Sequence, residues 1–162
     1  MAKDLEILGA PTLRLAFAVD RPVAMVAVRL SDVAPDDKAT RVTYGVLNLC
    51  YTPCQSASTA ALDPAALPEA MVSGTFHMHY RHPENLEPKR RYTAWVALNH
   101  IAQTFPASHR LRISLSTSYW PLAWPPPEPV RLSVFTGASQ LVLPERPPRE
   151  TDAAIRFEAP QG

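Results

Sequence analysis

The sequence has few glycines and cysteines, almost no net charge and no long hydrophobic run. Five glycines in 162 residues leave few positions where the backbone can adopt a left-handed conformation without strain. Two cysteines, Cys50 and Cys54, are too few for a disulfide-stabilised scaffold. No second cysteine pair follows them, so we expect two ordinary thiols and not a metal clamp or a redox pair.

Charge and hydropathy exclude several classes of partner. The 16 basic and 15 acidic residues give a formal net charge of +1, so nothing in the charge balance favours nucleic acid or an anionic membrane. No apolar run approaches the roughly 20 residues of a transmembrane helix, and residues 1–4 begin no apolar signal segment. We expect a protein with no nucleic-acid or membrane partner. We also expect it in the cytoplasm, provided that Met1 is the natural start.

Proline is abundant, and apolar residues alternate as they do in strands. The 18 prolines are about twice the usual share and disfavour helices. Between Arg110 and Ser116 the apolar residues occupy every second position, which is typical of a half-buried strand. We predict an all-β sandwich of eight or nine mainly antiparallel strands. The expected strands are 13–19, 23–30, 41–51, 70–80, 92–101, 111–116, 130–135 and 140–143, with 155–157 as an optional ninth.

The length suits one domain. We therefore expect residues 1–162 to form a single β-sandwich, with frayed ends at 1–4 and 148–162.

An aromatic and proline-rich segment follows the strand at 111–116. It contains Tyr119, Trp120 and Trp124, the last followed by three prolines from Pro125 onward. Three interpretations are open: packing within the domain, docking against another domain, since aromatic residues are enriched in interface cores, or stacking on a sugar. We take Tyr119, Trp120, Trp124 and Pro125 as candidates for a docking surface or ligand platform.

Other polar residues give weaker candidates for a site. His77 and His79 lie two apart on an expected strand, with His82 at its end. Zinc usually needs a third or fourth ligand at matching spacing, so we expect no metal and no other cofactor. Ser108 and His109 are adjacent and point to opposite faces of a strand, which disfavours a catalytic dyad.

Asp32 and Arg110 are our candidate structural pair. A charged residue buried in an apolar strand context must be paired. We predict that Asp32 accepts hydrogen bonds from Arg110 or from turn amides and thereby ties two strands together.

Several segments, in order, resemble a known family. They are Leu8–Pro11, Arg29–Asp36, Tyr44–Leu49, His82–Pro88, Phe105–Arg112, Tyr119–Pro121 and Leu141–Pro144. Together, over about residues 5–147, they resemble the C-terminal jelly-roll (galactose-binding-like) domain of the CocE/NonD hydrolases, which include X-Pro dipeptidyl-peptidases, cocaine esterase and α-amino-acid ester hydrolases. The resemblance implies a jelly-roll topology.

The chain departs from the family pattern at three glycines. Asp37, Lys89 and Ser108 stand where the family's motifs carry glycine. Glycine supplies a positive φ most easily, so the geometry of these three turns is left open by the sequence.

The resemblance also implies a function. In such hydrolases the Ser-Asp-His triad belongs to a preceding α/β-hydrolase domain that carries a G-x-S-x-G nucleophile elbow. No such motif occurs here; the nearest segment is Gly137–Leu141. The resemblance implies a non-catalytic accessory domain that braces the α/β-hydrolase core of a parent serine hydrolase. The parent would be an X-Pro dipeptidyl-peptidase or an acyl esterase. We expect the free domain to self-associate when its aromatic residues are exposed. The alternative is a stand-alone β-sandwich module that binds carbohydrate or peptide.

Overall fold

Antiparallel strands make up the regular structure of the chain. The computed structural model describes residues 1–51, 55–56, 83–147, 149 and 151. The strands are β1 (Leu5–Gly9), β2 (Thr12–Val19), β3 (Met25–Val33), β4 (Ala39–Asn48), β5 (Gln55–Ser56), β6 (Tyr92–Ala97), β7 (Ile101–Phe105), β8 (Arg110–Ser116), β9 (Leu132–Val134) and β10 (Gln140–Val142). The helices described are the 3-10 turns Leu49–Tyr51 and Thr136–Ala138. Within the described part of the chain, no helix is long and apolar enough to span a membrane.

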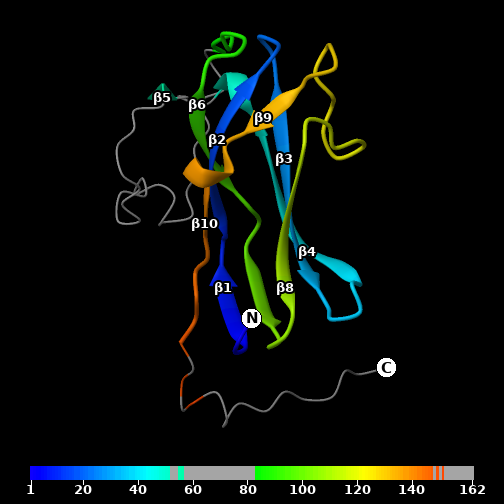
Figure 1. Ribbon diagram of the computed structural model, residues 1–162, viewed down its shortest axis with the longest axis vertical. Coiled ribbons are helices and arrows are strands. Elements are labelled where there is room, and N and C mark those ends of the chain that lie inside the picture. The colour runs from blue at the N-terminus through cyan, green and yellow to red at the C-terminus, as the bar shows by residue number, and fades with distance from the viewer. Residues whose placement is uncertain (52–54, 57–82, 148, 150, 152–162) are drawn as a thin grey trace.

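The strands form two facing layers (Figure 1). One sheet has the order β10-β2-β6-β5, and β9 also pairs with β2. The other has the order β4-β3-β8, and β1 and β7 form a separate pair. The ladders between these strands are antiparallel. The all-β sandwich expected from the sequence is confirmed.

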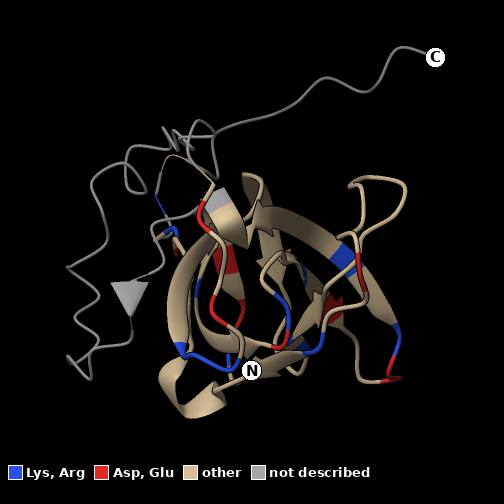
Figure 2. Cartoon of the chain, turned by 90° about the horizontal axis from the view of Figure 1, so that it is seen from above, with Lys and Arg blue, Asp and Glu red and all other residues tan. Residues whose placement is uncertain are grey.

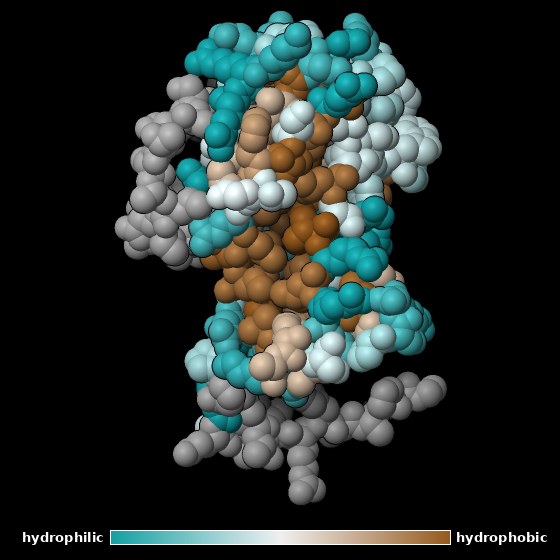
Figure 3. Space-filling view, viewed as in Figure 1, coloured by the Kyte–Doolittle hydropathy of each residue, from teal (hydrophilic) through white to brown (hydrophobic). Residues whose placement is uncertain are grey.

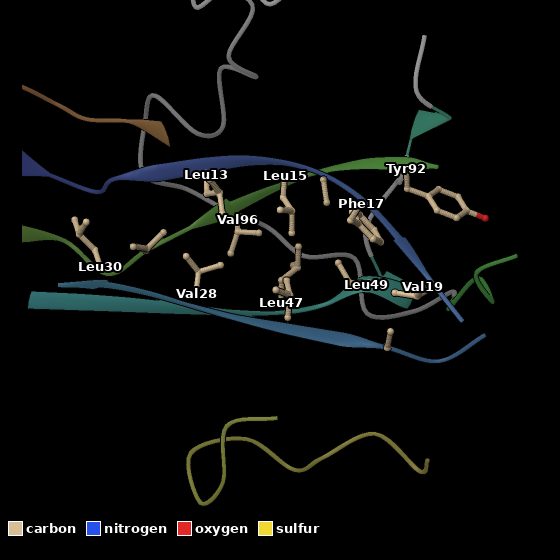
Figure 4. Close-up of a cluster of buried hydrophobic side chains, with 14 of the residues drawn as sticks. Leu13, Leu15, Phe17, Val19, Val28, Leu30, Leu47, Leu49, Tyr92 and Val96 are labelled. Carbon is tan, nitrogen blue, oxygen red and sulfur yellow. The ribbon is translucent and has the colours of Figure 1, made fainter. Parts of the chain in front are cut away.

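The core lies between the two sheets. Alternate residues of β2, from Leu13 to Val19, point toward Val28 and Leu30 of β3 and toward Leu47 of β4 (Figure 4). Phe17, with no exposed surface, stacks on Tyr92 at a centroid distance of 5.8 Å. One set of alternate side chains in each of these strands therefore faces the core, and β2 and the first half of β3 are buried on their other face as well.

The strand predicted over 92–101 is two strands. Leu98 N donates to Pro11 O at 2.8 Å in register with the β2–β6 ladder, but proline has no N–H to donate in return, and Asn99 N then donates to Tyr44 O at 3.0 Å. The chain changes partners here, so β6 ends at Ala97 and β7 begins at Ile101. The predicted strands at 70–80 and 155–157 lie outside the described residues.

At Gly45 the backbones of the two layers lie in close contact. A Cβ atom added there would lie 2.2 Å from the carbonyl oxygen of Ala97. Beside it, Thr43 Oγ1 donates a hydrogen bond to Asn99 O at 3.0 Å. Glycine at position 45 is thus required by the backbone of the opposite layer and not by its own dihedral angles.

The three turns in which the family's glycines are replaced keep a glycine-like backbone. Asp37, Lys89 and Ser108 have φ values of 67°, 68° and 70°. These three are the non-glycine residues with positive φ in the described part of the chain. Each turn is held by a backbone hydrogen bond: Asp37 N to Ala34 O, Lys89 N to Val19 O and Ser108 N to Met1 O.

Replacing Gly45 tests the contact between the layers. Gly45→Ala should lower the free energy of unfolding by about 1–3 kcal/mol, because the new methyl group meets backbone that cannot move aside. Gly137→Ala is the matched control, since nothing lies within 4 Å of its added Cβ. Urea or thermal unfolding measures both. Equal stability of the two variants would contradict the close approach.

Candidate docking surface

The segment Tyr119–Pro127, here called the aromatic loop, follows β8 and leaves the sheet. Ala123 N donates to Tyr119 O at 2.9 Å and closes a short turn, within which the Trp120–Pro121 peptide bond is cis. Four of the nine residues are prolines, which lack the N–H that a strand ladder needs. The loop lies on the side of β3 and β4 that faces away from the core (Figure 4).

The apolar side chains of the aromatic loop face the surroundings. Trp120, Leu122 and Trp124 are 63%, 58% and 81% exposed. The two tryptophan rings contact each other edge to face, with centroids 5.3 Å apart and an interplanar angle of 76°. Three large neighbouring apolar side chains at such exposure are unusual, because scattered single ones are the norm, and the segment therefore remains a candidate docking surface.

Tyr119 fixes this loop to the outer face of the sheet. Its ring lies 5.4 Å from that of Tyr44, and its hydroxyl accepts a hydrogen bond from Arg41 Nη1 at 3.0 Å. The guanidinium of Arg29 lies 6.0 Å from the same ring. Tyr119 is therefore a packed residue, unlike the two tryptophans.

A small hollow adjoins the loop. Trp124 and the three following prolines line it together with Met25 and Asn48, and its volume is about 230 Å³. Drug-sized ligands occupy pockets of roughly 300–1,000 Å³, so this hollow suits a single apolar side chain better than a free ligand. The two tryptophan rings are also steeply inclined to each other, so they do not form one flat surface on which a sugar ring could stack.

The sandwich has a second apolar surface along an open side. Leu111, Ile113 and Leu115 of β8 are partly buried and pack against the core, as are Leu132 and Val134 of β9. The space-filling view shows a continuous apolar stripe between the two layers (Figure 3). Among the described residues, β8 pairs only with β3. These side chains extend the core outward, whereas the tryptophans stand clear of it.

The predicted pair of Asp32 with Arg110 is wrong. Both Asp32 carboxylate oxygens lie within hydrogen-bond distance of His109 Nδ1, at 2.9 and 3.0 Å, and Arg110 pairs with exposed Asp37 instead. The register explains this. Asp32 lies opposite Leu111 and Val33 opposite Arg110, so Arg110 points to the other face from Asp32.

His109 precedes Arg110 and shares the face of Asp32. The two side chains are 22% and 14% exposed, and their bond joins the end of β3 to the start of β8. No serine hydroxyl in the described part of the chain hydrogen-bonds the His109 ring. Leu111 faces the core, and His109 lies two residues before it on the same face. Counting alternate positions back from Leu111 could therefore have identified His109 as the partner of Asp32.

The remaining sequence candidates give no site that the structure describes. His77, His79, His82 and Cys54 lie outside the described residues. Cys50 is buried, with its Sγ 3.5 Å from Pro22 O. Among residues 1–51, 55–56 and 83–147 no cluster of three metal-ligating side chains occurs.

Comparison with protein families adds the decisive finding. The family model for the X-Pro dipeptidyl-peptidase C-terminal non-catalytic domain matches residues 1–157. The chain belongs to this family. The accessory, non-catalytic character implied by the sequence resemblance is thereby confirmed. No curated protein matches the chain.

Solved structures share the fold at low sequence identity. An α-amino acid ester hydrolase matches 90% of this chain with 17% identity and a TM-score of 0.67. A CocE/NonD family hydrolase from Staphylococcus aureus matches 90% with 14% identity and a TM-score of 0.65. An aminopeptidase from a marine sediment thaumarchaeote matches 75% with 17% identity and a TM-score of 0.57. The chain spans 24%, 29% and 17% of these proteins, respectively.

Alanine substitutions distinguish the two pairings at this end of β3. Asp32→Ala should lower the free energy of unfolding by about 1–3 kcal/mol, because it leaves the half-buried His109 ring without its partner. Arg110→Ala should change it by less than about 0.5 kcal/mol, since its ion pair is exposed. Thermal unfolding measures both. A comparable large loss on both variants would restore the original pairing, and no loss on Asp32→Ala would show that neither pairing stabilises the fold.

Proposed function

We propose that this chain is the C-terminal accessory domain of a serine hydrolase and that it braces the α/β-hydrolase domain of the same parent protein. In this proposal the chain forms a single β-sandwich domain and the parent is an X-Pro dipeptidyl-peptidase or an acyl esterase located in the cytoplasm. The family is described as non-catalytic, and the sequence holds no G-x-S-x-G elbow.

The observation that carries the docking proposal is the exposure of the aromatic loop. Trp124 is 81% exposed beside a hollow that it helps to line, and no carboxylate or ammonium group occurs between Tyr119 and Pro127. Tryptophan is enriched among the residues that contribute most to protein–protein binding. A surface with this composition suits an apolar region of another protein domain. The same surface should make the free domain self-associate.

The test measures binding between the 162-residue chain and the α/β-hydrolase domain from the same source. Calorimetry should detect a complex, and Trp124→Ala and Trp120→Ala should each weaken it at least tenfold, since truncated interface tryptophans typically cost 2 kcal/mol or more. Phe135→Ala is the matched control, because Phe135 is 37% exposed, packs against Arg91 and is bonded through its N–H to Ala16 of β2, in the sheet opposite β4-β3-β8. A complex that tolerates both tryptophan variants would refute this docking surface.

The chain by itself gives a second readout. Sedimentation at rising protein concentration should show self-association that the Trp120→Ala/Trp124→Ala double variant removes, because exposed apolar patches favour association. A monomer at every concentration would count against self-association. Saturable binding to a glycan array that needs both tryptophans would instead support the stand-alone binding module.

A further inference from the structure

Beside the aromatic loop, the outer face of the sheet β4-β3-β8 carries two rows of arginine, tyrosine and serine. In the first row, Ser31 of β3 lies between Arg112 of β8 and Arg41 of β4. In the second row, Arg29 lies between Ser114 and Tyr44. Residues directly opposite each other in antiparallel strands share a face, so Arg29, Arg41 and Arg112 gather on one surface. We call these three residues the arginine cluster.

The positive charge of the cluster is not neutralised within the described part of the chain. None of its three members forms an ion pair with a described carboxylate. Three other exposed arginines are paired: Arg21 with Glu128, Arg90 with Glu87 and Arg110 with Asp37. Exposed Arg91 and Arg131 also form no ion pair with a described carboxylate, but they precede β6 and β9 in the other sheet and do not belong to the cluster. The chain as a whole mixes both signs around the sandwich (Figure 2) and has a net charge of only +1. The cluster is therefore a local feature.

Aromatic rings hold two of the three guanidinium groups in place. Arg41 lies 5.5 Å from the centroid of the Tyr44 ring and donates to the Tyr119 hydroxyl. Arg29 lies 6.0 Å from the centroid of the Tyr119 ring. A stacked guanidinium keeps most of its five N–H donors available. Cations ordered before binding lose less conformational entropy when a ligand arrives.

The cluster and the aromatic loop form one continuous surface, because Tyr119 belongs to the loop and contacts Arg29 and Arg41. A partner that covers Trp120 and Trp124 therefore meets the arginines as well. Burying these unpaired cations would be costly unless the partner supplies negative charge. Carboxylates match the planar donor fork of arginine in two-point hydrogen bonds.

We propose that the arginine cluster binds clustered Asp and Glu side chains on the hydrolase domain, at the border of an apolar region that covers the aromatic loop. This inference rests on the proposed function and names the chemistry of the partner surface. The loop supplies most of the affinity. The cluster speeds association and fixes the orientation of the docked domain, as complementary charge does at interfaces.

The experiment compares charge reversal at the cluster with the same change elsewhere. Arg29→Glu/Arg41→Glu/Arg112→Glu should weaken binding to the hydrolase domain at least tenfold, mainly by slowing association. The control Arg14→Glu/Arg91→Glu/Arg131→Glu makes the same change in net charge at β2, before β6 and before β9. It should stay within threefold of the original chain. Arg29→Gln/Arg41→Gln/Arg112→Gln repeats the test without introducing new charges, in case the reversal disturbs folding.

Salt dependence tests the same inference with no substitution. Raising NaCl from about 50 to 500 mM should weaken binding of the unmodified chain at least tenfold, because the salt screens exposed charges, and should barely affect the glutamine variant. Binding that needs Trp124 but ignores both salt and the cluster would overturn this inference and leave the proposed function standing. If the unmodified chain never binds the hydrolase domain, the proposed function itself fails. Binding of a DNA duplex in place of the hydrolase domain would also overturn the inference.

Discussion

The contact between Gly45 and the carbonyl of Ala97 sets the geometry on which the rest of the sandwich depends. At this point β4 reaches the backbone of the opposite layer with no side chain between them. The same region provides the hydrogen bonds from Asn99 N to Tyr44 O and from Thr43 Oγ1 to Asn99 O. Elsewhere the layers are held apart by interdigitated side chains, which tolerate small shifts more easily than a direct backbone contact does. The position of β4, and with it the outer face that carries Tyr44 and Arg41, follows from this contact.

The outer face in turn positions the aromatic loop. Tyr119 packs on Tyr44 and Arg29, and the prolines after Trp124 restrict the backbone that carries the exposed ring. Because a packed tyrosine anchors the loop and prolines stiffen it, the loop can hold apolar side chains at the surface and does not fold back to bury them. Among the described residues, the three most exposed large apolar side chains therefore lie on a stiffened support, a property that suits docking between domains.

Period-two alternation was enough to predict β8, whose Leu111, Ile113 and Leu115 pack against the core, whereas β2 and the first half of β3 are buried on both faces. It could not predict the division of 92–101, since the ladder stops at Pro11, which has no N–H, and Asn99 then bonds to Tyr44, far away in sequence. The partner of Asp32 was missed for a related reason: charge type suggested Arg110, while strand register selects His109. The aromatic loop could be identified as a surface candidate, but the arginine cluster required knowledge of which strands lie side by side.

The turns at Asp37, Lys89 and Ser108 have a thermodynamic consequence that concerns the unfolded chain. A side chain at positive φ strains the native backbone by about 1–2 kcal/mol. Glycine at the same position would remove that strain, yet it would enlarge the conformational freedom of the unfolded state, which costs about 0.4–1 kcal/mol on folding. The second effect offsets about half of the first. A chain with five glycines therefore holds three left-handed turns at a reduced net cost, because the restricted unfolded ensemble compensates for part of the native strain.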